Sequence, residues 1–146
     1  MSITRRRVCL LFPALIPAAV GTAALAAEDH SLPSTVYAFD GLPVEILDHA
    51  EMRSVLKGKL ATGESIEVHE TTLPAGGAPH APHHHVHSEM WLIREGILEL
   101  TIKGTSRRLG PDSVGFVHSN DEHGIKNVGD TPAKYFVVAV GPGADA

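Results

Sequence analysis

The chain has 146 residues, enough for one domain with a substantial core but too few for two. Its 17 acidic residues outnumber its 12 basic ones, for a formal net charge of −5 with neutral histidine, so a nucleic-acid-binding role is not expected. The single cysteine, Cys9, excludes an intramolecular disulfide. The fold must therefore be held by its own core, with a bound metal ion as a possible further support.

The first 26 residues have the pattern of an export signal peptide. Arg5 to Arg7 precede an apolar run that ends in the small-residue site Ala24-Leu25-Ala26. The arginines and the apolar run fit the twin-arginine class of bacterial signals, which predicts a periplasmic or secreted protein. Prolines break the run and no stop-transfer pattern follows it, so cleavage is favoured over a lasting membrane anchor. The mature part would keep nine basic and 17 acidic residues, a formal charge of −8.

Residues 27–62 are expected to form an N-terminal arm and leading strands. Short β-like runs lie at residues 35–39 and 55–60. Between them, Pro43 and the four residues after it suit one helical turn, because proline is favoured at an early helical position. The barrel itself is expected over residues 63–146, beginning with a β-like run at 65–72.

The second half of the chain contains five apolar runs that each end in turn residues: EMWLIREG, ILELTIKG, SVGFVHS, HGIKNVG and AKYFVVAVG. Short strands at such even spacing favour an all-β sandwich or barrel. In the second run Leu98, Leu100 and Ile102 share one face, as a half-buried strand requires. Residues 103–105, Lys-Gly-Thr, predict a hairpin turn before the next strand.

Five histidines lie between residues 80 and 87, and Glu89 follows them. In an extended segment His83 and His85 project from the same face and can share one ion, whereas His84 points the other way. A straight strand would carry Glu89 about 20 Å beyond His83. The chain must therefore turn at residues 86–88 if the carboxylate is to join the imidazoles. A fourth ligand has to come from another segment, and His123 is the best candidate.

Two stretches of the chain resemble the motifs of the cupin family. The first matches G-x5-H-x-H-x3-E-x6-G at Gly77, His83, His85, Glu89 and Gly96. The second, DSVGFVHSNDEHGIKN, resembles P-x-G-x-x-H-x-x-x-N at His123 and Asn127. It departs from that motif at His118 and Asn120, where the motif has proline and glycine. The spacing of the two stretches is typical of small single-domain cupins.

The resemblance implies a double-stranded β-helix, or small jelly-roll barrel, with one divalent metal near its mouth. Fe(II), Mn, Ni, Cu and Zn all suit such a site. Many cupins pair through edge strands, so a homodimer is implied as well. The ligands carried over to this chain are His83, His85, Glu89 and His123.

The reaction stays open at this point. A small oxygen-containing organic substrate is expected, with dioxygenation favoured by iron and isomerisation or decarboxylation of an acid or sugar derivative favoured by Mn, Ni or Zn. Glu89, as the only carboxylate among the ligands, is also the candidate catalytic proton acceptor. Two alternatives are a non-catalytic module that binds metal or a small ligand, and a metal that only staples the barrel.

Several nearby side chains have no definite role in the sequence. Solvent-exposed or supporting positions are expected for the four remaining histidines of these stretches, His80, His84, His87 and His118. Trp91 and Ile93 share strand parity with Glu89 and are candidates for lining a cavity beyond the metal, with Phe116 as a further candidate. Core packing explains apolar residues equally well; it is the expectation for Ile93, and it stays open for Trp91.

Overall fold

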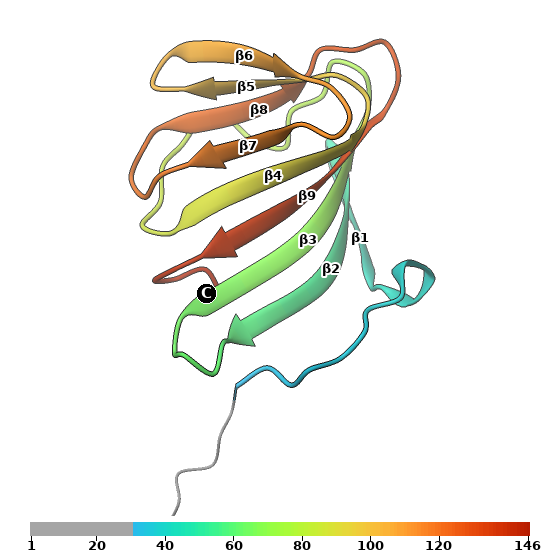
Figure 1. Cartoon of the computed structure of the whole chain (residues 1–146). Helices are drawn as coiled ribbons and strands as arrows, with labels where there is room; N and C mark the ends of the chain where they lie inside the picture. Colours follow the sequence, from blue (N-terminus) through green and yellow to red (C-terminus); the bar gives the residue numbers. More distant parts are fainter. Residues whose placement is uncertain (1–30) are drawn as a thin grey trace, which may run out of the picture.

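The structure is a computed structural model that describes residues 31–146 (Figure 1). The expected export signal at residues 1–26 lies outside the described residues. The described chain contains nine β-strands and one 3-10 turn, η1 (Phe39–Gly41). Within this part of the chain, no helix has the length and apolar character needed to cross a membrane.

The strands form two antiparallel sheets that wrap around one core (Figure 1). The six-stranded sheet has the order β1-β2-β3-β9-β4-β7, and the three-stranded sheet has the order β6-β5-β8. The strand bounds are β1 (Val44–Leu47), β2 (Ala50–Lys59), β3 (Ser65–Leu73), β4 (Ser88–Glu95), β5 (Leu98–Ile102), β6 (Thr105–Leu109), β7 (Val114–Val117), β8 (His123–Asn127) and β9 (Ala133–Val140). The expected all-β jelly-roll barrel is confirmed.

The core is built from the inward-facing positions of alternating strands. In β9 four alternate residues, from Ala133 to Ala139, are buried, while the residues between them are half-buried. Leu98 and Leu100 of β5 are buried on the predicted face. The hairpin predicted after β5 is also confirmed, because Ile102 pairs with Thr105 and both residues between them have positive φ. Such a two-residue turn matches the twist of the flanking strands.

Two expectations for the N-terminal part are wrong. The predicted helical turn at residues 43–47 is the strand β1, which pairs antiparallel with β2 from Val44↔Arg53 to Leu47↔Ala50. The predicted strand at residues 35–39 has no regular structure before η1. Val44 and Ile46 are β-branched, and the partner that β2 provides outweighs the local preference created by Pro43.

Gly96 allows the turn after β4 to approach the start of β9. Its φ is +81°, and a Cβ at this position would lie 2.6 Å from the Cβ of Ala133. A side chain would therefore force the β4–β5 connection away from the sheet.

Candidate metal centre and adjoining cavity

Backbone pairing brings the two separate histidine segments together. His83 and His123 form an antiparallel bridge in which each amide donates to the other's carbonyl oxygen at 2.9 Å. On its other side His123 pairs with Ile102 of β5. His83 therefore extends the edge of the three-stranded sheet, and its side chain is held next to that of His123. Their ring centroids are 4.7 Å apart.

The six-stranded sheet supplies the carboxylate. The chain leaves His85, crosses between the sheets, and begins β4 at Ser88, so the turn predicted at residues 86–88 is present. Glu89 projects back over the imidazoles. Its Oε1 lies 3.4 Å from Nε2 of His85, and its Oε2 lies 3.4 Å from Nε2 of His123. The site thus draws donors from both sheets and from the segment that connects them.

The four residues proposed from the motifs are brought together. Donor atoms of His83, His85 and His123 all lie within 4.8 Å of one another. His123 is 2% exposed, and the side chains of His85 and Glu89 are 16% and 15% exposed. An ion placed between them would be shielded from solvent on most sides.

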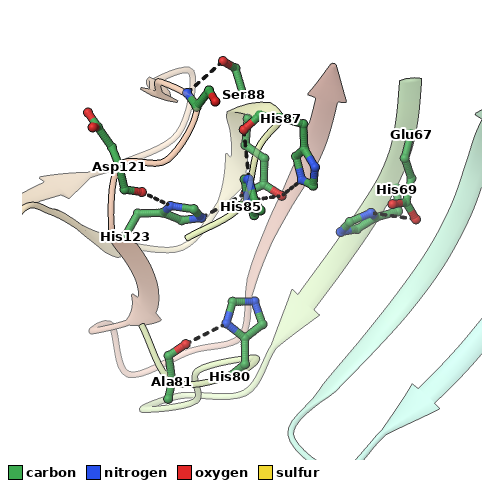
Figure 2. A network of polar contacts seen from close by, with 11 residues as sticks. Glu67, His69, His80, Ala81, His85, His87, Ser88, Asp121 and His123 are labelled. Atoms are coloured by element: carbon green, nitrogen blue, oxygen red, sulfur yellow. Dashed lines mark hydrogen bonds and ion pairs between the residues drawn. The ribbon is translucent and has the colours of Figure 1, made fainter. Parts of the chain in front are cut away.

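The hydrogen bonds of two imidazoles fix which nitrogen faces the centre. Nδ1 of His85 donates to the carbonyl oxygen of His87 at 2.9 Å, and Nδ1 of His123 donates to that of Asp121 at 2.8 Å (Figure 2). Since a carbonyl only accepts, the proton sits on Nδ1 and the lone pair on Nε2. A hydrogen bond from the outer ring nitrogen to a carbonyl oxygen orients histidines that ligate metals.

The remaining nitrogens are buried without partners. Nε2 of His85, Nε2 of His123 and Nδ1 of His83 have no hydrogen-bond partner. Burial, reinforced by the positive charges of the neighbouring histidines, lowers the pKa of His83 and favours its neutral form. Buried, unpartnered imidazole nitrogens that lie close together beside a carboxylate fit a divalent cation.

His87 lies closer to this centre than the sequence analysis expects. Its ring stacks on that of His85 with centroids 3.6 Å apart, and its Nε2 is 3.7 Å from Oε1 of Glu89. His85, His87 and Glu89 form a second group whose donor atoms lie within 4.8 Å of one another. The period-2 spacing of residues 83, 85, 87 and 89 is the signal that could have found it.

The other histidines of the two stretches lie outside the ligand group. His84 is exposed, as expected from its parity. His80 is exposed and its ring meets that of His83 edge-on at 4.2 Å. His118 is exposed and hydrogen-bonds the carbonyl oxygen of Ser119. Asn120, two residues later, has φ 64°, a conformation that asparagine tolerates well and that explains why the cupin motif has glycine there.

Asn127, the last residue of the second motif, has a structural role. It is fully buried, and its Nδ2 donates to the carbonyl oxygens of Leu73, Pro74 and Thr131 at 2.8 to 3.1 Å. Its Oδ1 accepts from the amide of Gly129 at 3.0 Å. The side chain thereby holds the end of β3 to the loop between β8 and β9.

A cavity of about 210 Å³ adjoins the candidate metal centre. Glu89, His123 and His80 line its metal end, and His69, Thr71 and Tyr135 add polar groups elsewhere. The rest of the wall is mainly apolar: Leu47, Ala50, Met52, Trp91, Ile125 and Val137, with Pro79. β1 and β2 thus supply part of the wall.

Trp91 lines the cavity, with its ring centroid 5.4 Å from that of His123, whereas Ile93 is buried in the core and does not line it. The expectation for Phe116 is wrong, because its side chain is 56% exposed on the outer face of the six-stranded sheet. Glu89 pairs with Val117 and Trp91 with Gly115, so Phe116 has the opposite parity. Gly115 leaves room for Leu100, since a Cβ there would lie 2.6 Å from Cδ2 of Leu100.

Comparisons with known proteins agree with this fold. Residues 69–139 match the family model described as Cupin domain. No curated protein sequence matches the chain. Among solved structures, a predicted oxalate decarboxylase from Thermotoga maritima is similar with a TM-score of 0.62 and 20% identity, over 73% of this chain and 99% of that one.

Two further structures show the same likeness. An RmlC-like cupin from Shewanella frigidimarina has a TM-score of 0.63 and 16% identity, over 77% of this chain and 96% of that one. A polyketide cyclase from Streptomyces resistomycificus has a TM-score of 0.60 and 16% identity, over 74% and 80%. These likenesses show the cupin fold, which is shared by proteins named for different activities.

Proposed function

We propose that this protein is a metal-binding cupin that holds one divalent ion with His83, His85, Glu89 and His123. The convergence of buried, unpartnered imidazole nitrogens beside a carboxylate carries the proposal. Fe(II), Mn, Ni, Cu and Zn all accept three imidazoles and one carboxylate. His87 is a further candidate ligand, because its donor atom lies close to those of His85 and Glu89.

The function supported best is that of an enzyme acting on a small oxygen-containing organic molecule. A bound ion supplies Lewis-acid polarisation of an oxygen atom of the substrate. The cavity favours a substrate of roughly monocyclic size, because its 210 Å³ is little more than the cavity of about 150 Å³ that holds benzene. Drug-sized ligands need about 300 Å³ or more. Isomerisation or decarboxylation of a small acid or sugar derivative suits this volume better than dioxygenation of a flavonol.

Glu89 is proposed as the proton acceptor. Its two oxygens face different histidines, and the residue also lines the cavity. It therefore lies between the metal site and the space for a substrate. A Glu89→Gln variant that kept full turnover and full metal content would contradict this role.

Calorimetric titration of metal-free protein with Co(II), Ni(II) and Zn(II) tests the proposed function. One ion per chain should bind, and His123→Ala should weaken binding about 100-fold or more, since it removes a buried ligand. His84→Gln is the matched control and should leave binding unchanged, because His84 is exposed. Equal binding by all three proteins would assign the metal to the surface histidines and refute the site.

A non-catalytic binding module is the second candidate, because among the described residues that line the cavity no carboxylate other than Glu89 is found. Screening metal-loaded protein against small keto acids, hydroxy acids and sugar derivatives separates the two. Metal-dependent turnover of any of them favours the enzyme, whereas saturable binding without turnover favours the module.

We also propose that the chain forms a homodimer. The support is β7, an edge strand of the six-stranded sheet on which Val114 and Phe116 are 57% and 56% exposed. An exposed apolar edge strand is a site for pairing with another chain. Phe116→Glu should shift a dimer to a monomer in light scattering, without loss of metal binding.

The proposed export by the twin-arginine route rests on the sequence alone. Replacing Arg5 and Arg6 by lysine should retain the protein in the cytoplasm. N-terminal sequencing of exported protein should find a start near Ala27.

A further inference from the structure

The cavity wall opposite the candidate metal centre contains a histidine that the metal site does not use. His69 projects from β3, its side chain is 18% exposed, and it lines the cavity. Its Nδ1 is buried without a hydrogen bond and lies 3.8 Å from Oε1 of Glu67, two residues earlier on the same face. Figure 2 shows Nδ1 turned toward Glu67 and the other end of the ring turned away from it, toward the side where His80 and His123 lie.

The sheet register sets His69 and Glu67 across from the metal end. Glu67 pairs with Ala139 of β9, which in turn pairs with Glu89 of β4, so the two glutamates share one row of the inner face. His69 occupies the next row, with Val137 and Trp91. The strands β3 and β4 are two spacings apart, roughly 9–10 Å. In the row of the two glutamates the intervening residue is Ala139, whereas the row of His69 borders the cavity, which Val137 and Trp91 also line.

The other polar groups of the wall already have partners or roles. A side-chain hydrogen bond links Thr71 to Tyr135, and burial raises the pKa of Tyr135, which keeps its hydroxyl neutral. His80 bonds the carbonyl oxygen of Ala81. Burial lowers the pKa of His69, opposed by the charges of Glu67 and Glu89, so its imidazole is neutral near pH 7 and can accept a proton. His69 is thus the polar group of this wall that is available to a ligand.

We propose that His69, oriented by Glu67, binds and deprotonates a small organic acid, such as an enol or hydroxamic acid, in this cavity. The inference rests on the proposed metal site, which would hold the other end of the ligand. Nε2 of the neutral imidazole takes the proton from the ligand's O–H group. The O–H bond breaks, its electron pair stays on the ligand oxygen, and an N–H bond forms. Glu67 and the negative charge left on the ligand oxygen offset the positive charge of the imidazolium.

Binding of acetohydroxamic acid to Co(II)-loaded full-length protein tests this role. At neutral pH the probe still carries its O–H proton, and it chelates metals. Calorimetry in two buffers of different ionisation enthalpy counts the protons released to solvent. In the wild type the proton should remain on the protein. His69→Gln should release about one more proton per ligand and bind about tenfold more weakly or worse.

The controls separate this inference from the proposed function. Glu67→Gln should give an intermediate loss, and His84→Gln should behave as the wild type. Oxalate, which is fully ionised at neutral pH, should show the same proton count with all variants. If Co(II) does not bind and produces no visible spectrum, the metal site itself is refuted. If Co(II) binds normally but His69→Gln changes neither affinity nor proton count for acetohydroxamic acid, the role of His69 is overturned.

Discussion

The histidine cluster and the surroundings of Glu70 are two regions in which buried polar atoms lack hydrogen bonds, and they differ in how those atoms are arranged. At the cluster, unpartnered nitrogens of three imidazoles lie close to one another beside Glu89. Glu70 lies on β3, opposite Arg53 in the backbone pairing with β2, and is 0% exposed. Both its carboxylate oxygens lack a hydrogen bond. Arg53 instead donates to Glu51 at 2.8 Å.

This difference distinguishes a candidate binding site, the histidine cluster, from a buried group that lowers the stability of the fold, Glu70. Unpartnered atoms that converge on one point can all be satisfied by a single cation, so their energy is recovered on binding. An isolated buried carboxylate has no such remedy, and it favours the protonated form instead. Burial raises the pKa of Glu70, opposed by the charges of Arg94, Lys134 and Arg53.

Asn127 is a third buried polar group, and both ends of its side-chain amide form hydrogen bonds. Its substitution should have the largest effect on stability. Asn127→Asp keeps the shape but replaces a donor with a charge facing the carbonyl oxygens of Leu73, Pro74 and Thr131. The free energy of unfolding should fall by about 3 kcal/mol. Urea unfolding monitored by fluorescence measures it, and a loss below about 1 kcal/mol would contradict the assigned role.

Metal loading should have the next largest effect. Free metal at about 100 times the dissociation constant should raise the free energy of unfolding by about 2.7 kcal/mol in the wild type. The metal-free protein should still unfold cooperatively, because an extensive apolar core lies behind the site. Thermal melting with and without Zn(II) measures both. If the metal-free chain showed no melting transition, this would favour the alternative in which the metal ion only stabilises the barrel.

Glu70→Gln should have a smaller effect and, unlike Asn127→Asp, should stabilise the protein. With a raised pKa, Glu70 binds its proton more tightly in the folded state, so stability falls as pH rises from about 4.5 through the raised value. Glutamine removes this dependence and should stabilise the protein at pH 7 by about 1 kcal/mol. The two melting curves should converge near pH 4. A variant less stable than the wild type at pH 7 would show that Glu70 is satisfied by its neighbouring cations.

Local patterns in the sequence predict a large part of the fold. Alternation places Leu98 and Leu100 inside, and Lys103-Gly104 gives the turn, because strand period and turn geometry are local properties. β1 could not be predicted in this way. Its strand character depends on pairing with β2, and Pro43 by itself favours a helical turn.

Much of the candidate site follows from the spacing of its residues, and the rest depends on register. His83, His85 and Glu89 share one parity, and the motif resemblance adds His123. The outward direction of Phe116 depends on the pairing of β4 with β7, which no local pattern reveals. His69 and Glu67 face the site only because β9 lies between β3 and β4. His87 falls in the turn predicted at residues 86–88, and its parity matches that of the ligands.

Anomalous diffraction from crystals grown with Co(II) tests the central claim most directly. One peak should appear about 2 Å from an imidazole nitrogen of each of His83, His85 and His123 and from a carboxylate oxygen of Glu89. A peak bound instead to exposed histidines such as His84, with His123 turned away from it, would contradict the account.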